Sequence, residues 1–173
     1  MDIYRKMRLS KREVRDKKEL RNIIENCDVL RIGVCDEEGI FIVPVNFGYE
    51  WKEDSMGNVD LRLYLHSAGE GRKADAFAVN PMVAIEMDCD HELITGDYAC
   101  SYSFGFSSIM GSGRIYQVTD PEKKKHGISL VMAHTAPGTA LDFKEEMIRR
   151  TNVYCIHVEH FTGKERKKKK QPS

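Results

Sequence analysis

The stretch YLHSAGEGRK, residues Tyr64 to Lys73, carries the strongest structural signal of the chain. Leucines alternate with polar residues up to His66, which predicts a half-buried strand, and two glycines then free the backbone as a helix begins. The first amides of a helix lack internal acceptors and lie at the positive end of its dipole, so this helix start favours an anion. Arg72 can bind phosphate oxygens bidentately, and Lys73 adds a point charge. The alternative is a plain glycine turn whose two cations face water.

A second informative stretch, VPVNFGY at residues 43–49, lies upstream. Pro44 removes one backbone donor from a predicted strand, which indicates an edge strand or a bulge. Gly48 lets a flat ligand approach the backbone, and Asn46 offers both a donor and an acceptor to a planar heterocycle. Core packing alone is the alternative explanation of this stretch.

The length and composition of the chain are those of one domain. A chain of 173 residues with 41% apolar residues can bury one real core. We expect a single domain over residues 1–163 and a basic, disordered tail over residues 164–173. No apolar run has the length of a signal peptide core or a membrane span, so we expect a soluble, cytoplasmic protein. Five cysteines without a CxxC pair suggest neither a disulfide framework nor a zinc ribbon.

The formal charge of zero hides an uneven distribution. Both ends are basic, whereas residues 22–163 hold twelve basic and twenty-two acidic residues, a net charge of −10. A basic tail such as Lys164–Lys170 can contact nucleic acid, but an acidic body opposes docking on a polyanion. We therefore favour a solvated tail over a nucleic-acid adaptor.

The apolar periodicity predicts short strands in hairpin-like order, interrupted by helices. Ser10 and Glu13 form a capping box, and Asp120 with Pro121 marks a second helix start. Helices are expected at about residues 11–27, 70–79, 121–134 and 141–150, strands at 29–35, 40–47, 61–66, 82–87, 102–118 and 152–160, and loops at 51–60 and 88–100. No repeated βαβ rhythm is present, so an antiparallel, closed or partly closed barrel with flanking helices fits best.

Metal-ligating residue types gather at Asp88–Glu92, with the sequence DCDHE. Adjacent residues at a strand end point to opposite faces, and no partner cluster is spaced to complete a coordination shell. A polar loop without a metal is therefore expected there.

Several motifs in order resemble one protein family. They are Met7-Arg8, VPVNFGYE at 43–50, YLHSAGEGRK at 64–73, NPMVAIE at 80–86, FSSIMGSGRI at 106–115 and DPEKKKHGISLVM at 120–132. Over about residues 7–160, the chain resembles the FMN-binding split-barrel proteins related to pyridoxamine 5′-phosphate oxidase. Within them it resembles the nitroimidazole-resistance (Nim) group.

The resemblance implies a mainly β (α+β) fold, a six-stranded antiparallel split β-barrel with flanking helices, that forms a homodimer with two FMN molecules at its interface. By the same resemblance, backbone of Val45, Asn46 and Phe47 lines the isoalloxazine, His66, Ser67, Gly71, Arg72 and Lys73 hold the phosphate end, and Ser108 comes from the partner subunit. The histidine that matches His66 is implicated in substrate reduction in the Nim group. A purely structural role, hydrogen-bonding the phosphate or a carbonyl, stays open for His66.

The sequence also departs from the family pattern. Phe106-Ser107-Ser108-Ile109 lacks a phenol and a guanidinium that relatives carry near the expected pocket. The chain has a lysine tail in place of the arginine-rich C-terminal segment of true pyridoxamine 5′-phosphate oxidases, so that activity is not expected. The resemblance implies an FMN-dependent oxidoreductase that uses a nicotinamide donor and a small planar acceptor, such as a 5-nitroimidazole. A flavin-storage protein without dedicated turnover is the alternative.

Overall fold

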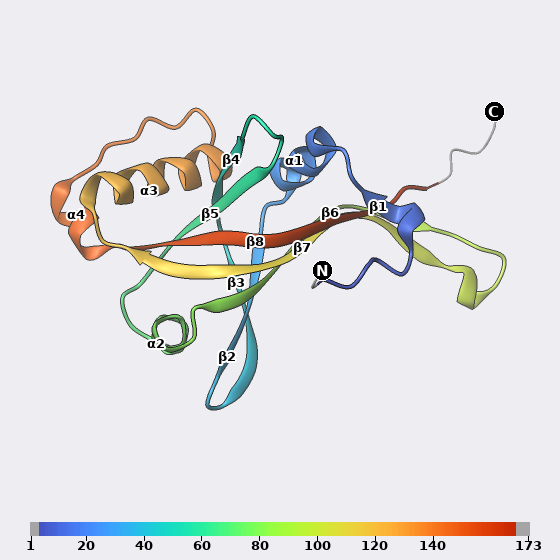
Figure 1. Ribbon diagram of the computed structural model, residues 1–173, viewed down its shortest axis with the longest axis horizontal. Helices are drawn as coiled ribbons and strands as arrows, with labels where there is room; N and C mark the ends of the chain where they lie inside the picture. Colours follow the sequence, from blue (N-terminus) through green and yellow to red (C-terminus); the bar gives the residue numbers. More distant parts are fainter. Residues whose placement is uncertain (1–3, 169–173) are drawn as a thin grey trace.

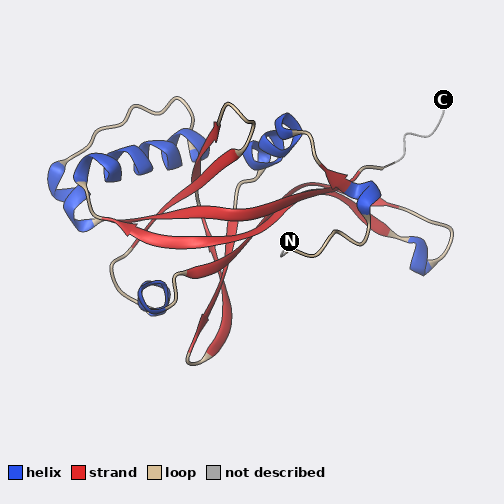
Figure 2. Cartoon of the chain, viewed as in Figure 1, coloured by secondary structure: helices blue, strands red, loops and turns tan. Residues whose placement is uncertain are grey.

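The computed structural model describes residues 4–168, and one antiparallel sheet holds the strands of this part of the chain (Figures 1 and 2). The strand order is β3-β2-β6-β7-β8-β5-β4, and β1 pairs with β8 outside this path. The strands are β1 (Glu13–Val14), β2 (Leu30–Asp36), β3 (Gly39–Val45), β4 (Gly48–Glu53), β5 (Val59–Ser67), β6 (Met82–Ile94), β7 (Ser103–Val118) and β8 (Asn152–Arg166). The α-helices are α1 (Lys17–Asn26), α2 (Arg72–Val79), α3 (Pro121–Thr135) and α4 (Glu145–Arg150), with short 3-10 helices at Ser10–Arg12 and Ala99–Ser101.

This architecture confirms the predicted fold class, an antiparallel sheet with flanking helices. Pro44 lies on β3, at one end of the strand order, so the predicted edge position is also confirmed. The expected count of six strands was too low, because β1 and β4 were not predicted. β4 begins at Gly48 and takes up part of the predicted loop 51–60, and the single strand expected at residues 40–47 ends at Val45.

Other predicted boundaries were also wrong. Asp16, not Ser10, caps the first α-helix, because its carboxylate accepts the amides of Lys18 and Glu19. The predicted loop 88–100 is mostly strand, since β6 continues past a bulge to Ile94. β8 likewise runs to Arg166, so the first residues of the predicted tail are paired in the sheet; residues 169–173 lie outside the described part.

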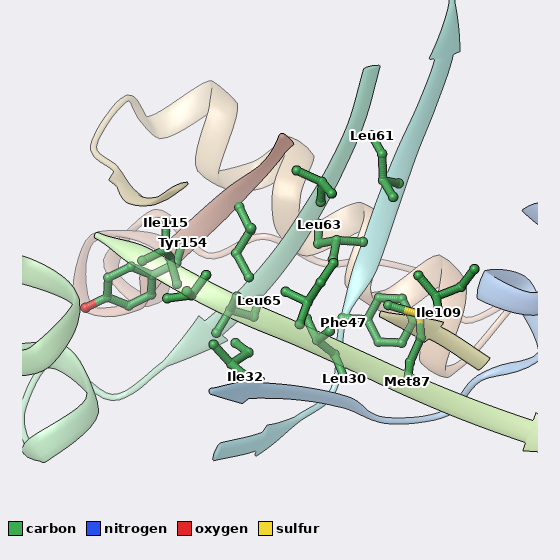
Figure 3. Close-up of a cluster of buried hydrophobic side chains, with 14 of the residues drawn as sticks. Leu30, Ile32, Phe47, Leu61, Leu63, Leu65, Met87, Ile109, Ile115 and Tyr154 are labelled. Atoms are coloured by element: carbon green, nitrogen blue, oxygen red, sulfur yellow. The ribbon is translucent and has the colours of Figure 1, made fainter. Parts of the chain in front are cut away.

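The main core fills the inner side of the curved sheet. The alternating leucines of β5 are fully buried here together with Phe47 and Ile32, as Figure 3 shows. The alternation that predicted a half-buried strand thus places one face of β5 in this core.

A smaller core lies on the other face of β5, beneath α3. It contains Tyr64, Val131 and Val153, and it fixes α3 against the sheet. A Cβ at Gly48 would clash with the Leu130 carbonyl carbon, so glycine is what allows α3 to approach β4 this closely. In Figure 1, α3 and α2 lie on opposite sides of the β7–β8 pair.

None of the helices within residues 4–168 combines the length and the apolar character needed to cross a bilayer.

Candidate functional site

The last two residues of β5, His66 and Ser67, face two different regions of the molecule. His66 is exposed, whereas Ser67 is 8% exposed and its hydroxyl donates to the Ala68 carbonyl at 2.9 Å. Successive strand residues point to opposite faces, so His66 lies on the α3 side and Ser67 on the other. Within residues 4–168, His66 forms no side-chain hydrogen bond or ion pair, which leaves its imidazole available to a ligand.

The start of α2 is open. Gly71 has φ of 110°, a conformation that residues with a Cβ rarely adopt, and a Cβ there would meet nothing within 4 Å. Within residues 4–168 no side chain caps this helix start, and the amides of Arg72 and Lys73 have no acceptor within the helix. Lys73 is half-buried and forms no ion pair in the described part of the chain. The helix start predicted from YLHSAGEGRK is therefore present, with amides that lack an acceptor within the helix and a lysine next to them.

Arg72 binds carboxylates of the β2–β3 turn. Its Nε and Nη2 donate to Asp36 at 2.6 and 2.8 Å, and Nη1 lies 3.4 Å from Glu38. The guanidinium also stacks over the Phe41 ring at 4.2 Å. The Arg72 hydrogen bond lowers the pKa of Asp36 below its usual value. A phosphate at this site would therefore have to share or displace a guanidinium that Asp36 already binds. No local motif predicts this ion pair, because its partners come from distant segments.

The junction between β3 and β4 approaches the same end of β5. β4 is antiparallel to β5 with Gly48 opposite Tyr64, so the residues before Gly48 extend in the direction of His66. Asn46 is exposed, Val45 is half-buried, and the Phe47 ring is fully buried against His134 at 4.4 Å. Asn46 and backbone groups, but not the Phe47 side chain, are thus available to a planar ligand.

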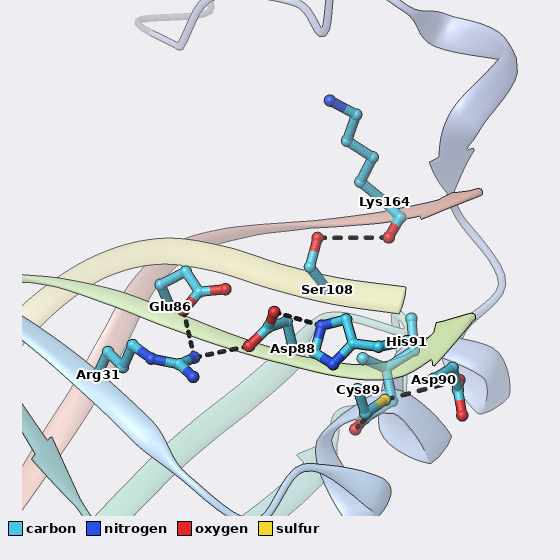
Figure 4. A network of polar contacts seen from close by, with 9 residues as sticks. Arg31, Glu86, Asp88, Cys89, Asp90, His91, Ser108 and Lys164 are labelled. Carbon is cyan, nitrogen blue, oxygen red and sulfur yellow. Dashed lines mark hydrogen bonds and ion pairs between the residues drawn. The ribbon is translucent and has the colours of Figure 1, made fainter. Parts of the chain in front are cut away.

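Ser108 lies far from this region within one subunit. On β8, Val153 is level with His66 and Lys164 is level with Ser108, eleven residues further along. At about 3.3 Å per residue, this corresponds to about 35 Å along the strand. Figure 4 shows the Ser108 hydroxyl directed at the Lys164 carbonyl, to which it donates at 3.4 Å. The structure therefore does not bring Ser108 together with His66–Lys73 in one chain.

Asp88 and His91 of DCDHE belong to a network of ion pairs between β6 and β2 (Figure 4). Arg31 binds Asp88 at 2.6 Å and Glu86 at 2.9 Å, and His91 lies 2.7 Å from Asp88. Burial raises the pKa of Asp88, but hydrogen bonds from Arg31 and His91 outweigh it and leave the pKa below its usual value. Among residues 4–168, no three such side chains are grouped to hold a metal ion.

His66 also forms one wall of a cavity of about 350 Å³. The cavity is lined mainly by apolar side chains from α3, from the segment before α4 and from α4, namely Ile128, Met132, residues 140–144, Met147, Ile148 and Thr151. The sequence motifs did not predict this cavity, because its residues are distributed over two helices and a connection without a motif of their own.

A buried lysine anchors the wall formed by α4. Lys124 of α3 is 8% exposed, and its ammonium group donates to the carbonyls of Thr151 at 3.0 Å and Ile148 at 3.4 Å. A cation at a helix C-terminus stabilises the last carbonyls. Lys124 therefore fixes a six-residue helix that is too short to be stable alone.

Comparison with known proteins identifies the family of this chain. The sequence model of the pyridoxamine 5′-phosphate oxidase family matches residues 16–165. Among solved structures, a candidate 5-nitroimidazole antibiotic resistance protein of Bacteroides thetaiotaomicron VPI-5482 is similar at 31% identity and a TM-score of 0.74, over 88% of this chain and 85% of that one. No curated protein matches the chain significantly.

Two further structures share the fold at low identity. A flavocytochrome of Azotobacter vinelandii matches at 18% identity and a TM-score of 0.76, over 97% of this chain and 75% of that one. An FAD- and heme-binding protein of Mycobacterium smegmatis matches at 13% identity and a TM-score of 0.76, over 94% and 77%. The resemblance predicted from the motifs is confirmed: the chain belongs to the pyridoxamine 5′-phosphate oxidase family.

Proposed function

We propose that this protein is a flavin-dependent oxidoreductase that binds FMN and passes electrons from a nicotinamide donor to a small planar acceptor. The observation that carries the proposal is the open start of α2, with Gly71 at φ of 110° and two cations next to it. Family membership and the 31% identical relative with a nitroimidazole-resistance description support the same reading.

The residues present fit a phosphorylated flavin. The amides of Arg72 and Lys73 and the Lys73 ammonium group supply donors for phosphate oxygens, and Gly71 leaves the space above them open. An exposed Asn46 near the end of β5 supplies a donor and an acceptor for a heterocycle. Arg72 fits only in part, because Asp36 competes for its guanidinium.

A second subunit completes the site in this proposal. Ser108 lies about 35 Å along the strands from His66, which no single small ligand spans. A role for Ser108 at the cofactor therefore requires a copy of the chain that presents its β7 next to the α2 start of the first. Exposed apolar side chains on β3 and β7, such as Ile40, Ile42 and Met110, are available for burial in such a homodimer.

The protein residues have distinct roles in the proposed reaction. The flavin, when bound, supplies the electron chemistry. The α2 start neutralises and positions the phosphate, and the β3–β4 junction orients the ring system. His66 is placed to donate a hydrogen bond or a proton to an acceptor bound on the α3 side of β5.

An anaerobic reoxidation assay tests the activity. The FMN-loaded protein is reduced with NADH or NADPH and then mixed with a 5-nitroimidazole or, separately, with air-saturated buffer. We expect the nitro compound to reoxidise the protein faster than oxygen does. Equal rates would refute the nitroreductase activity and favour the storage function.

A further inference from the structure

We propose that the cavity between α3 and α4 binds the acceptor as a neutral, flat ring compound, with His66 as its polar contact. The inference rests on the proposed function only for the ligand's role as electron acceptor. The cavity lies on the opposite face of β5 from Ser67, and its volume is about 350 Å³.

The volume of the cavity suits a ligand with one substituted ring or two fused rings. An apolar protein cavity of about 150 Å³ accommodates benzene, and small-molecule sites begin at about 300 Å³. The cavity here lies just above that lower limit. The cavity and the proposed cofactor site at α2 are separate, because they lie on opposite faces of β5.

The lining selects against a charged ligand. Ile128, Met132 and Phe143 form apolar walls, and thioether groups adapt to flat rings. Asp142 and Lys144 are both exposed at the rim, so their opposite charges leave the entrance with no net charge. Burial of a carboxylate or phosphate among these side chains would carry a large desolvation cost.

His66 supplies a polar contact at one end of the cavity and so favours one orientation of the ligand. It is the residue that β5 contributes to the lining, and its imidazole is not engaged by another side chain or carbonyl within residues 4–168. A polar substituent of the ring, such as a nitro or carbonyl oxygen, therefore finds its hydrogen-bond partner at the β5 end. The apolar part of the ring then packs between Met132 and Met147 of the two helices.

Methionine-methyl NMR of the FMN-loaded protein tests the inference. The chain has eight methionines, of which Met132 and Met147 line the cavity. We expect 4-nitrobenzyl alcohol to shift these two methyl signals. Met87, fully buried in the main core, and Met56, 83% exposed in the β4–β5 turn, should not move. The anionic 4-nitrobenzoate should bind at least about tenfold more weakly. Shifts elsewhere, or equal affinity for the two compounds, would overturn the proposal.

A matched pair of variants tests the cavity without changing the core: one fills the cavity and the other is its control. Ala140 lines the cavity and is exposed, whereas Ala133 is exposed on α3 outside it. Ala140→Trp should weaken 4-nitrobenzyl alcohol binding at least about tenfold, and Ala133→Trp should leave it unchanged. Equal effects of both variants, or none, would contradict the assignment. The wild-type methyl shifts remain a test even if Ala140→Trp does not fold.

The proposed activity and the proposed binding cavity can be refuted separately. If the compound binds at Met132 and Met147 but no acceptor is reduced, the cavity stands and the proposed activity is refuted. If acceptors are reduced while these methyls do not shift and Ala140→Trp keeps wild-type kinetics, the activity stands and the cavity is refuted.

Discussion

The α2 start and the α3–α4 cavity share the end of β5 but are opposite in chemistry. Both begin at the end of β5, one after Ser67 and the other at His66. The first is exposed and rich in charge, with Arg72 and Lys73 near the acids of the β2–β3 turn. The second is apolar, with a neutral rim. Strand alternation thus lets one element separate the proposed phosphate site from the proposed ring site, and each region should respond to its own substitutions.

The largest expected effect is at the charged region. Replacing Arg72 and Lys73 together with alanine should weaken FMN binding by about 100-fold, because charge-assisted hydrogen bonds to the phosphate are lost. Riboflavin, which has no phosphate, should lose less than about threefold. Flavin fluorescence titration measures both. Lys144→Ala, at the cavity rim, serves as the control and should leave FMN affinity unchanged; equal weakening of FMN and riboflavin would place the phosphate elsewhere.

The next effect concerns Lys124, which holds α4, one wall of the cavity, in place. Lys124→Met keeps the volume of the buried side chain but removes its bonds to the last carbonyls of α4. Hydrogen exchange of residues 145–151 should become about tenfold faster, equivalent to ~1.4 kcal/mol of local opening free energy. Lys123→Met, at an exposed neighbouring position, should leave this exchange unchanged. Unchanged exchange in Lys124→Met would show that packing alone holds α4.

A smaller effect tests the competition for Arg72. Asp36→Asn removes the charge that holds the guanidinium and should raise FMN affinity about fivefold, since exposed ion pairs are weak. The same titration measures it, and binding of 4-nitrobenzyl alcohol serves as the control. Weaker FMN binding would mean that Asp36 positions Arg72 rather than competing with the phosphate.

The smallest effect probes the attachment of α3, which carries one wall of the cavity. Glu50 accepts a hydrogen bond from Tyr64 at 3.0 Å and lies 2.9 Å from His126 of α3. Burial raises the pKa of Glu50, but His126, Tyr64 and Lys52 outweigh it and leave the pKa below its usual value. A carboxylate with a lowered pKa stabilises the fold above its unfolded value of about 4.3 and loses this as the pH falls through the folded value.

Glu50→Gln should therefore lower the free energy of unfolding by ~1 kcal/mol at pH 7 and by progressively less below about pH 4. Urea unfolding at several pH values measures this. Glu37→Gln, at an exposed position of the β2–β3 turn, is the control. A destabilisation that does not change with pH would exclude the charge of Glu50 as its cause.

Local patterns were enough to predict the fold class and the α2 start. The leucine alternation of β5, the glycines before Arg72 and the Asp120-Pro121 helix start each act within a few residues, and the structure has all three. The predicted strand boundaries were wrong where pairing with a neighbouring strand overrides the local secondary-structure propensity of the residues. β6 extends through the polar residues after Asp88 because β7 pairs with it and Arg31 neutralises its acids.

The rest of the candidate site depends on contacts between distant segments. Asp36 and Arg72 are far apart in sequence, and only the β2–β3 turn brings them together. The cavity similarly requires α3, α4 and His66 to meet, and no spacing rule connects Met132 with Met147. Local motifs therefore indicated the helix start that we propose as a phosphate site, but not the ion pair between Asp36 and Arg72 or the position of the cavity.

The most direct test of the account is the cofactor of the purified protein. A visible absorption spectrum, followed by the mass of the ligand released on denaturation, should show oxidised flavin and the mass of FMN after incubation with a mixture of FMN, FAD and riboflavin. Release of haem, or of no flavin after this incubation, would contradict FMN binding by this protein.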